Sequence, residues 1–388
     1  MLKRAIEIRI DEYLAGDSHK ILFIWGPRRS GKTTILQKLS AKLRIPIFNF
    51  DVLSDKEKFL PKRDVLQQLA KDTKIILIDE VQNYPESTVA LKILHDEFNI
   101  KIIATGSSEL RQKTKDFDSL AGRFLESYCL PLSISEIANN TLVKAYEKQE
   151  FYNTIQEQLQ IFGAYPEVYA QNLLSESEKI DLLQNILDAY VLKDIITIYD
   201  LKNERLAKDI LTKIALQIGA EVSIREIANS LQANVVTVSN YIDIFIKNYI
   251  LIPLPSFKTK ARKAVSENRK LYFYDLGIRN ILVKDFRPLN LRPDKGGLFE
   301  NFIVSEIEKL RKNTHAKETL YFYREYSGQE VDVVLEDYQK HYVCIEIKLQ
   351  SRKSLKDIFP LPHTFITINM DNYFEKIGEL FDFSLTPT

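Results

Sequence analysis

Three short apolar runs in the first third of the chain constrain the fold most strongly. They are Ile21-Leu22-Phe23-Ile24-Trp25, Ile75-Ile76-Leu77-Ile78 and Ile102-Ile103-Ala104. Each run ends in small or acidic residues, and the segments between them have helical periodicity. Unbroken apolar strands that alternate with helices are typical of a parallel sheet covered on both faces. We therefore expect an α/β domain over residues 1–135.

The length of the chain indicates further domains. It has 388 residues, whereas one domain usually contains about 100–200 residues. Residues 136–217 have helical periodicity and are expected to form a helical lid or linker. Residues 218–285 are predicted to form a winged helix-turn-helix, and residues 286–388 one helix followed by β-rich sequence. The expected fold class is thus α/β and multidomain.

Charge and cysteine usage exclude several classes of protein. Fifty-four Lys and Arg residues balance 53 Asp and Glu residues, so the net charge of +1 excludes a wholly basic nucleic-acid coat, although not a local patch. Cys129 and Cys344 have no metal-ligand or disulfide spacing, which favours a reducing cytosol. The first residues become charged too early for a signal peptide, and no apolar run approaches the roughly 18 residues of a membrane span. We expect a soluble, cytoplasmic protein.

A glycine-rich segment directly follows the first apolar run. It reads Gly26-Pro27-Arg28-Arg29-Ser30-Gly31-Lys32-Thr33-Thr34, and its first eight residues match the phosphate-binding P-loop in full. In such a loop backbone N–H groups surround the phosphates, and the next helix presents its positive N-terminus to them. We assign the whole segment to ATP binding. Lys32 is predicted to reach the β- and γ-phosphates, and Thr33 to ligate Mg²⁺.

Asp79 and Glu80 follow the second apolar run. Asp79 is predicted to hold Mg²⁺ directly or through water, and Glu80 to polarise the water that attacks ATP. The alternative is that both acids only cap the next helix. Beside a complete P-loop, the acidic pair favours ATP hydrolysis over nucleotide binding alone.

Two more candidates lie close to the third apolar run. Ser107, in Ala104-Thr105-Gly106-Ser107-Ser108, is a candidate sensor of the γ-phosphate, although Ser and Gly are also ordinary turn residues. Arg123, in Leu120-Ala121-Gly122-Arg123-Phe124, is a candidate arginine finger, acting in its own chain or in a neighbouring one. A solvated or structural arginine is the alternative. A finger acting on a neighbour would imply a homo-oligomer.

A helix-turn-helix is predicted after residue 218. Ser223-Ile224-Arg225-Glu226 has the pattern of a capping box and begins a helix that ends near Leu231. A second helix leaves Thr237, Ser239 and Asn240 outside, where a recognition helix meets DNA. Segment 258–270 then contains Lys258, Lys260, Arg262, Lys263, Arg269 and Lys270 against one acid, Glu267. Such a basic wing is predicted to contact DNA phosphates. The alternative is that the winged helix packs on its own ATPase domain.

The last hundred residues contain a constellation of carboxylates and a lysine. Glu300 lies in the apolar stripe of a helix predicted over Leu298 to Leu310, where an acid needs a partner or a metal. Asp332 lies in a strand, and in the next strand Glu346 and Lys348 project to one face. Glu300, Asp332 and Glu346 are predicted to hold Mg²⁺, and Lys348 to act in phosphodiester cleavage. The alternative is a charged hairpin with one solvated face.

The order of the motifs resembles that of the prokaryotic AAA-type ATP-binding proteins with a nuclease-like domain at the C-terminus. The residues that carry it are the P-loop, Ile78-Asp79-Glu80, Thr105-Gly106-Ser107-Ser108, Leu120-Ala121-Gly122-Arg123, Pro131-Leu132-Ser133-Ile134-Ser135-Glu136, Tyr272-Phe273-Tyr274-Asp275-Leu276-Gly277, Phe299-Glu300-Asn301, Gly328-Gln329-Glu330-Val331-Asp332 and Glu346-Ile347-Lys348.

This resemblance implies an AAA-type ATPase core, a winged helix and a restriction-endonuclease-like α/β domain with the fold of the PD-(D/E)XK nucleases. Phe162-Gly163-Ala164-Tyr165-Pro166 departs from the pattern, because the family more often has paired glycines there. The alternative function is an ATP-driven switch or a regulatory ATPase in defence or signalling, whose nuclease-like domain is a non-catalytic binding module.

Overall fold

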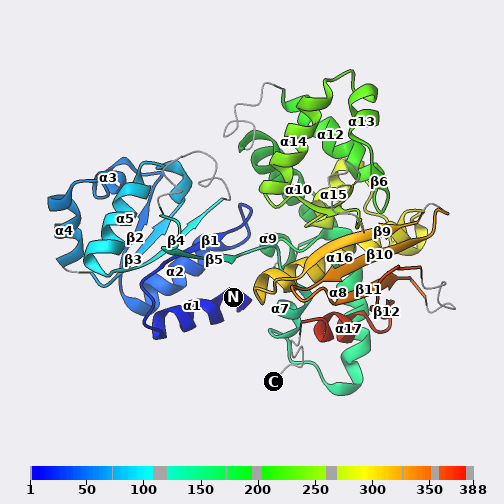
Figure 1. Ribbon diagram of the computed structural model, residues 1–388, viewed down its shortest axis with the longest axis horizontal. Helices are drawn as coiled ribbons and strands as arrows, with labels where there is room; N and C mark the ends of the chain where they lie inside the picture. Colours follow the sequence, from blue (N-terminus) through cyan, green and yellow to red (C-terminus); the bar gives the residue numbers. More distant parts are fainter. Residues whose placement is uncertain are drawn as a thin grey trace. The chain divides into compact units, whose positions relative to one another are not determined.

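The chain forms two compact units. The structure is a computed structural model that describes residues 2–71, 73–107, 120–170, 174–194, 203–258, 269–325, 327–350 and 358–381. One unit is Lys3–Leu130, and the other combines Met1–Leu2 with Pro131–Thr388 (Figure 1). The first unit ends close to the predicted limit at residue 135. The three later stretches that the sequence separates belong to one compact unit.

A parallel five-stranded sheet forms the centre of the first unit, in the order β2-β3-β4-β1-β5. Its elements are α1 (Ala5–Ala15), β1 (Ile21–Trp25), α2 (Lys32–Leu43), β2 (Ile47–Asn49), α3 (Leu53–Glu57), α4 (Arg63–Lys71), β3 (Ile75–Asp79), η1 (Val81–Asn83), α5 (Ser87–Phe98), β4 (Lys101–Gly106) and β5 (Phe124–Tyr128). The three apolar runs are β1, β3 and most of β4. The predicted parallel sheet is therefore confirmed.

The core of this unit explains why the strands are apolar throughout. All five residues of β1 are buried. Leu22 and Ile24 join one hydrophobic cluster with Ile10 of α1 and Leu36 of α2. Because parallel strands end at the same edge of a sheet, the segments that follow β1, β3 and β4 meet there.

The second unit begins with helices and continues into two antiparallel or mixed sheets. Its elements are α7 (Ile134–Ala138), η3 (Ala145–Glu147), α8 (Lys148–Phe162), α9 (Pro166–Tyr169), α10 (Glu176–Asn185), η4 (Ile186–Asp194), α12 (Glu204–Leu216), β6 (Glu221–Val222), α13 (Ile224–Ser230), α14 (Val235–Lys247), β7 (Leu251–Pro255), β8 (Arg269–Phe273), α15 (Leu276–Val283), η6 (Leu289–Leu291), α16 (Lys295–Asn313), β9 (Thr319–Arg324), β10 (Glu330–Glu336), β11 (Tyr342–Ile347), β12 (Thr364–Ile368) and α17 (Tyr373–Glu379).

Helices α13 and α14 lie in the segment that is predicted to form a helix-turn-helix. The Ser223 hydroxyl accepts the Glu226 N–H, and Asn234 accepts the Val236 N–H, so each helix begins at a side-chain cap. Val238, Ile242 and Phe245 form the buried face of α14. Strands β6, β8 and β7 form a three-stranded antiparallel sheet. In the sequence, β6 precedes α13, and β7 and β8 follow α14.

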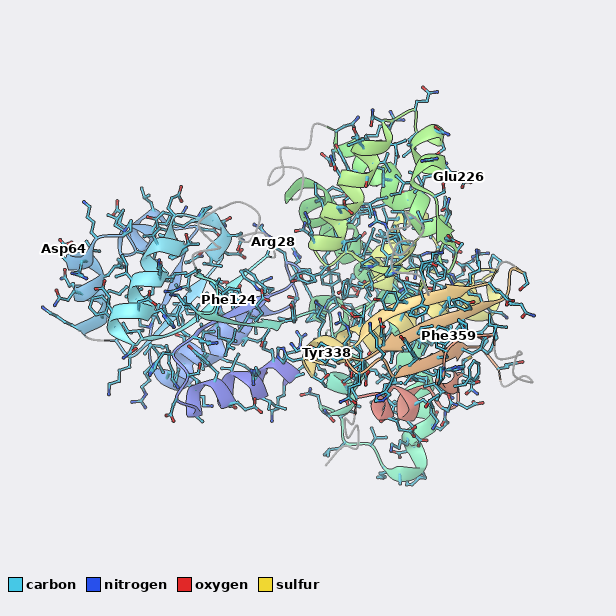
Figure 2. All side chains as sticks on the ribbon, in the orientation of Figure 1. Arg28, Asp64, Phe124, Glu226, Tyr338 and Phe359 are labelled. Atoms are coloured by element: carbon cyan, nitrogen blue, oxygen red, sulfur yellow. The ribbon has the colours of Figure 1, made fainter. Side chains whose placement is uncertain are left out.

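A four-stranded mixed sheet, in the order β12-β11-β10-β9, forms the C-terminal part of this unit. Helix α16 packs on β8 and β11 (Figure 1). The segment after β7 reaches this sheet as well, because the Phe257 N–H donates to the carbonyl of Phe322 in β9 at 2.7 Å. The Phe257 ring packs in an aromatic cluster with Tyr321, Tyr342 and Phe359, the last of which is labelled in Figure 2. The segment that follows β7 therefore contributes to the core of the C-terminal sheet.

The segments Phe162-Gly163-Ala164-Tyr165-Pro166 and Tyr272-Phe273-Tyr274-Asp275-Leu276-Gly277 pack against each other. Gly163 has a φ of +75°, and a Cβ atom there would lie 2.1 Å from Oδ1 of Asp275. Asp275 caps α15 and accepts the Ala164 N–H at 2.6 Å. A Cβ atom at Gly277 would lie 2.4 Å from the Phe162 carbonyl oxygen. The close contact between the two segments therefore needs only one glycine in each, Gly163 and Gly277. The second glycine that the family more often has next to Gly163 is absent from this sequence.

Candidate functional site

The P-loop lies between β1 and α2, at the carboxyl edge of the parallel sheet. Gly31 directly precedes α2 and has a φ of +99°, in the left-handed region that favours glycine. A Cβ atom at Gly26 would lie 2.0 Å from the carbonyl oxygen of Cys129, so a larger residue would displace the backbone. The two glycines therefore allow the tight course that a phosphate-binding loop requires.

Lys32 folds back over this loop. Its Nζ donates to the carbonyls of Gly26 at 2.8 Å and of Pro27 at 2.7 Å. Burial lowers the pKa of the Lys32 ammonium, and the nearby acids Glu80 and Asp79 oppose that effect. The lysine that P-loop chemistry requires is thus placed at the loop itself.

Asp79 joins the ends of three elements at the carboxyl edge of the sheet. It is the last residue of β3, and it accepts hydrogen bonds from Thr33 at 2.8 Å and from Thr105 of β4. A carboxylate and a threonine hydroxyl are the oxygen donors that Mg²⁺ prefers beside a nucleotide. The structure therefore brings the predicted ligands Thr33 and Asp79 together, and they fit the ion.

Gln82 connects Glu80 with Ser107. The Gln82 side chain is buried; its Nε2 donates to Glu80 Oε2, and its Oε1 accepts the Ser107 N–H at 3.2 Å. Glu80 has a φ of +54°, which is uncommon for a residue other than glycine. Sequence analysis identified Glu80 and Ser107 but missed the amide side chain between them.

Arg4 supports the P-loop from a distant part of the chain. It is buried, and its two terminal nitrogens donate to the carbonyls of Ser30 and Leu130, both at 2.5 Å. Sequence analysis did not single it out, because its partners are 26 and 126 residues away. Of the other predicted ATP-binding residues, Arg29 is exposed, and Arg28 and Thr34 are half-buried.

Arg123 lies at the opposite edge of the sheet from the P-loop. It precedes β5, whose first residue pairs with Ile21 at the start of β1, whereas the P-loop follows the end of β1. Five strand residues span roughly 16 Å. Arg123 instead donates to Asp96 at 2.8 Å, and its guanidinium and the ring of His95 lower the pKa of Asp96 to about 2. The structure therefore does not bring Arg123 to the P-loop of its own chain, and action on a neighbour stays a prediction.

A second group of charged residues converges in the C-terminal sheet. Glu300 comes from α16, Glu330 and Asp332 from β10, and Glu346 from β11. Carboxylate oxygens of Glu300, Glu330 and Asp332 lie within 4.8 Å of one another. Lys348 directly follows β11, and its Nζ lies 2.5 Å from Glu346 Oε1. The predicted residues Glu300 and Asp332 thus lie together, with Glu330 as the third carboxylate of this group, whereas Glu346 pairs with Lys348.

The charges of this group perturb one another. Burial, and then the neighbouring carboxylates of Glu300 and Glu346, raise the pKa of Asp332 to about 7, although the Ile347 N–H donates to it at 2.7 Å. Burial lowers the pKa of Lys348, but its bond to Glu346 and the nearby Asp332 outweigh burial and raise it overall. The negative charges of the cluster are therefore only partly stabilised by hydrogen bonds and solvent.

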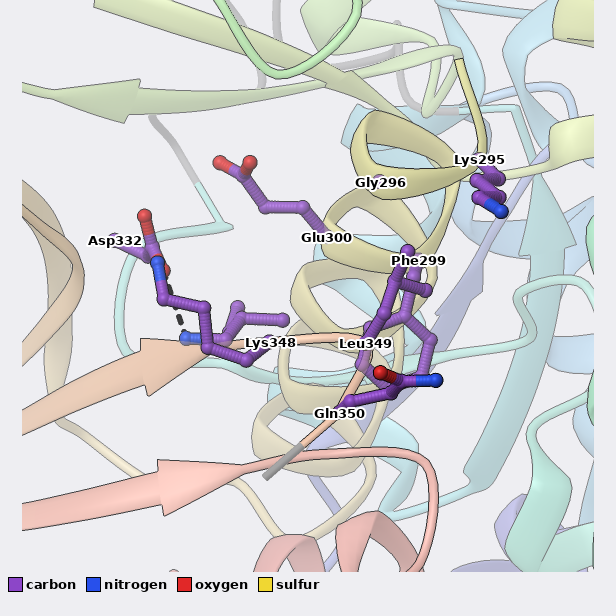
Figure 3. A pocket seen from close by; sticks show the side chains of 9 residues that line it. Lys295, Gly296, Phe299, Glu300, Asp332, Lys348, Leu349 and Gln350 are labelled. Atoms are coloured by element: carbon purple, nitrogen blue, oxygen red, sulfur yellow. Dashed lines mark hydrogen bonds between the residues drawn. The ribbon is translucent and has the colours of Figure 1, made fainter. Parts of the chain in front are cut away.

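A cavity of about 440 Å³ opens onto this cluster. Figure 3 shows the carboxylates of Glu300 and Asp332 facing the same space, with Lys348 beside Asp332. Gly296, one turn before Glu300 on α16, and Phe299, directly before Glu300, line the cavity on another side. Carboxylate oxygens at an open cavity fit a hydrated divalent cation, so the residues suit the predicted Mg²⁺.

Two residues of β8, Lys270 and Tyr272, contact the carboxylates of this cluster. Lys270 forms ion pairs with Glu300, at 2.9 Å, and with Glu330, and the Tyr272 hydroxyl donates to Glu300 at 2.5 Å. The expectation that Lys270 contacts DNA phosphates is wrong, because its side chain is only 2% exposed. Burial, then Glu300, raises the pKa of Tyr272 well above its usual value.

The rest of the predicted DNA-contacting surface is described only in part. Asn240 is exposed, and Thr237 and Ser239 are half-buried. Arg269 pairs with Asp243 of α14 at 3.3 Å. Lys260, Arg262 and Lys263 lie outside the described residues, so the basic wing stays a prediction.

Three family models match successive parts of the chain. Residues 18–138 match a family described as an AAA domain. Residues 153–293 and 295–364 match two families, each described as a domain of unknown function, DUF8612 and DUF4143. The AAA match and the parallel sheet with its P-loop together support the predicted AAA-type ATPase domain, and the chain is an α/β multidomain protein. The descriptions name neither a winged helix nor a nuclease.

Several curated proteins resemble the chain. An uncharacterized protein of Methanocaldococcus jannaschii is 28% identical over 97% of this chain and 84% of its own length. A second from that organism is 25% identical, and the match spans 71% of this chain but only 64% of the relative. An uncharacterized protein of Haemophilus influenzae is 24% identical, over 68% of this chain and 69% of its own.

Solved structures show a more distant similarity. The Thermotoga maritima RuvB Holliday junction branch migration motor is 14% identical, with a TM-score of 0.31, over 66% of this chain and 90% of that chain. The Bacillus subtilis DNA clamp loader delta protein is 11% identical, with a TM-score of 0.24, over 79% of this chain and 100% of that chain. Among the helices of the described residues, none combines the length and apolar character of a membrane span.

Proposed function

We propose that the chain is a Mg²⁺-dependent ATPase coupled to a DNA-binding part and to a metal-dependent DNA-cleaving centre. The observation that carries the ATPase proposal is the meeting of Lys32, Thr33, Asp79 and Glu80 at one edge of the parallel sheet. Bound Mg²⁺ would neutralise charge on the phosphates. Thr33 and Asp79 would hold this ion, Lys32 would contact the β- and γ-phosphates, and Glu80 would orient the attacking water and accept its proton.

Two substitutions test this assignment. Lys32→Ala should weaken ATP binding, because it removes a charge that contacts the phosphates. Glu80→Gln should leave binding intact and lower turnover by about a hundredfold or more, because only the proton acceptor is lost. Equilibrium binding of a fluorescent ATP analogue and phosphate release measure the two effects separately. Full turnover in Glu80→Gln would contradict the role of Glu80.

The carboxylate cluster supports the proposal of a cleavage centre. Glu300 and Asp332, which line the cavity, would hold a divalent cation together with Glu346 of the neighbouring strand, and the bound ion would supply an activated water molecule. Lys348 keeps its ammonium at Glu346, beside the cavity, where it orients the water or neutralises the scissile phosphate. Lysine is not a ligand of Mg²⁺, so its role is separable from metal binding.

A plasmid-nicking assay with Mg²⁺ or Mn²⁺ tests the cleavage proposal. Asp332→Ala and Glu346→Ala should abolish both nicking and metal binding, whereas Lys348→Ala should bind metal and not nick. ATP hydrolysis should survive all three changes, because the P-loop belongs to the other compact unit. Nicking that persists in Asp332→Ala would show that the activity resides elsewhere or in a contaminant.

The DNA-binding part of the proposal depends on the helix-turn-helix. Helices α13 and α14, followed by the antiparallel strands β7 and β8, have the element order of a winged helix. Replacing Lys260, Arg262 and Lys263 by Gln should reduce the dependence of DNA affinity on salt concentration, since fewer counterions would be released. An unchanged salt dependence would instead assign the winged helix to a protein contact.

A second candidate function is an ATP-driven switch with a non-catalytic C-terminal module. The observation in its favour is that Glu300, Glu330 and Glu346 already have lysine partners within the protein. Such a module would bind neither Mn²⁺ nor Mg²⁺ in the absence of nucleotide. Calorimetry with an Asp79→Asn chain, in which the ATP site lacks its carboxylate, separates the two functions.

A further inference from the structure

Lys270 is a buried cation that belongs to none of the elements supplying the carboxylates. It projects from β8 and its side chain is 2% exposed. Its Nζ is 2.9 Å from Glu300, is ion-paired with Glu330, and lies 5.7 Å from the centre of the Phe322 ring. A lysine buried to this degree is rare unless carboxylates compensate its charge.

The charges of the cluster define how many ions it can accept. Glu300, Glu330, Asp332 and Glu346 contribute four negative charges when ionised, and Lys270 and Lys348 contribute two positive charges. The remainder is two negative charges, which one divalent cation neutralises. Without Lys270 the remainder would be three, too many for a single divalent ion to balance.

The cluster also has two distinct sides. Glu300 and Glu330 contact Lys270, whereas Glu300 and Asp332 line the cavity. Lys270 therefore occupies the side toward β8, and a hydrated ion can approach the side toward the cavity. Glu300 belongs to both sides, and the Tyr272 hydroxyl holds the same Glu300 oxygen that Lys270 contacts.

We propose that Lys270 is a built-in cation that fills a second metal position between Glu300 and Glu330 and thereby limits the centre to one divalent ion on the cavity side, at Glu300 and Asp332. Lys270 is a positioning residue, because it acts through Glu300 and Glu330. This inference rests on the proposed metal centre, and it adds that the centre needs the β8 strand as well as the C-terminal sheet.

Titration calorimetry with Mn²⁺ on the full chain tests the proposal. Every protein carries Asp79→Asn, so that the ATP site contributes no ion. The parent chain should bind one Mn²⁺, and Lys270→Met, which keeps most of the length of the side chain but not its charge, should bind two. Adding Glu330→Gln to Lys270→Met should restore a single ion. Arg269→Gln, on the same strand but paired with Asp243 instead, is the matched control and should bind one.

Each result separates the inference from the proposed function. One ion in both the parent and Lys270→Met would overturn the role of Lys270 and leave the metal centre intact. Two ions in the parent would also overturn it. No ion in the parent would contradict the metal centre itself, and with it this inference.

A second variant covers the case in which Lys270→Met does not fold. Glu330→Gln retains the shape of the side chain and leaves Lys270 with Glu300. It should bind one Mn²⁺ with an affinity roughly three- to tenfold weaker, because one negative charge is removed next to the ion. Two bound ions, or an unchanged affinity, would overturn the proposal.

Discussion

Gln82 joins two functional groups of the ATP site with one amide side chain. Its Nε2 donates to Glu80 and its Oε1 accepts the Ser107 N–H, so the orientation of the amide is fixed from both ends. The same oxygen would lie 2.6 Å from a Cβ atom at Gly106, which shows how closely β4 approaches it. If the γ-phosphate moved Ser107, the Gln82 side chain would therefore move with it and shift the carboxylate of Glu80.

We predict that Gln82→Ala lowers the turnover of ATP by roughly ten- to a hundredfold without weakening ATP binding, because Glu80 loses the contact that orients it. Gln82→Glu should be as slow, since a second carboxylate would repel that of Glu80. Steady-state phosphate release and nucleotide affinity provide the two readouts. A loss confined to affinity would assign Gln82 to binding rather than to orientation.

Asp332 gives the metal-free protein a stability that depends on pH. Its pKa is about 7 in the folded chain and about 4 in an unfolded one. Between these values the folded chain binds more protons, so the contribution of Asp332 to stability is most favourable below about pH 4 and decreases until about pH 7. Asp332→Asn should therefore increase the free energy of unfolding by about 1–2 kcal/mol at about pH 8, and by almost nothing near pH 4.

Urea denaturation in the presence of a chelator measures this difference. Asp337→Asn is the matched control, because the backbone N–H of His341 lowers the pKa of that exposed carboxylate, and its removal should not stabilise the chain. Equal stability of the wild type and Asp332→Asn at high pH would show that Asp332 is not strained by its neighbours.

At the scale of elements, Gly163 at the end of α8 and Gly277 at the start of α15 allow these two helices to meet closely. Gly163 ends α8 in the left-handed region and lies directly against Asp275, the cap of α15. We predict that Gly163→Ala destabilises the chain by more than about 2 kcal/mol, because it adds a steric clash to a strained φ. Thermal unfolding monitored by circular dichroism measures the loss.

Gly328 provides the control for this prediction. It has a φ of +88° and nothing within 4 Å of an added Cβ atom. Gly328→Ala should thus cost only the backbone term, about 1 kcal/mol. Equal losses at the two glycines would show that the contact with Asp275 contributes nothing.

The elements that the sequence predicted well are those defined by contiguous residues. The apolar run Ile21–Trp25 is β1 residue for residue, and the P-loop and Asp79-Glu80 follow their strands as expected. Lys270 was assigned to a basic surface because it follows other cations in the sequence. Its partners Glu300 and Glu330 are 30 and 60 residues away, and no local pattern encodes such a pair. Sequence analysis missed Arg4 for a similar reason, because Leu130, which it contacts, is 126 residues away.

At the scale of the whole molecule, the two compact units place the two proposed centres in separate cores. The P-loop belongs to Lys3–Leu130, and the carboxylate cluster to the unit that begins at Pro131. A ligand that binds only a folded site stabilises the unit that contains it by RT ln(1 + [L]/Kd), about 2.7 kcal/mol at a hundredfold excess over Kd.

We therefore predict two calorimetric transitions with different ligand responses. A non-hydrolysable ATP analogue with Mg²⁺ should raise the Tm of one transition, and Mn²⁺ without nucleotide, in an Asp79→Asn chain, should raise the Tm of the other. Asp332→Ala should abolish only the second response. A single transition that both ligands shift equally would show that the units unfold as one cooperative structure.

The insertion of Phe257 into the C-terminal aromatic cluster has a practical consequence for protein engineering. A fragment cut at residue 286, or at the family match that begins at residue 295, would lose the Phe257 ring and the Lys270 ammonium together. It would expose Tyr321, Tyr342 and Phe359 and leave Glu300 and Glu330 without their cation. Expressed fragments, domain swaps and fusions of this part should therefore begin before Leu251, at the start of β7, even though the family matches divide the chain near residue 294.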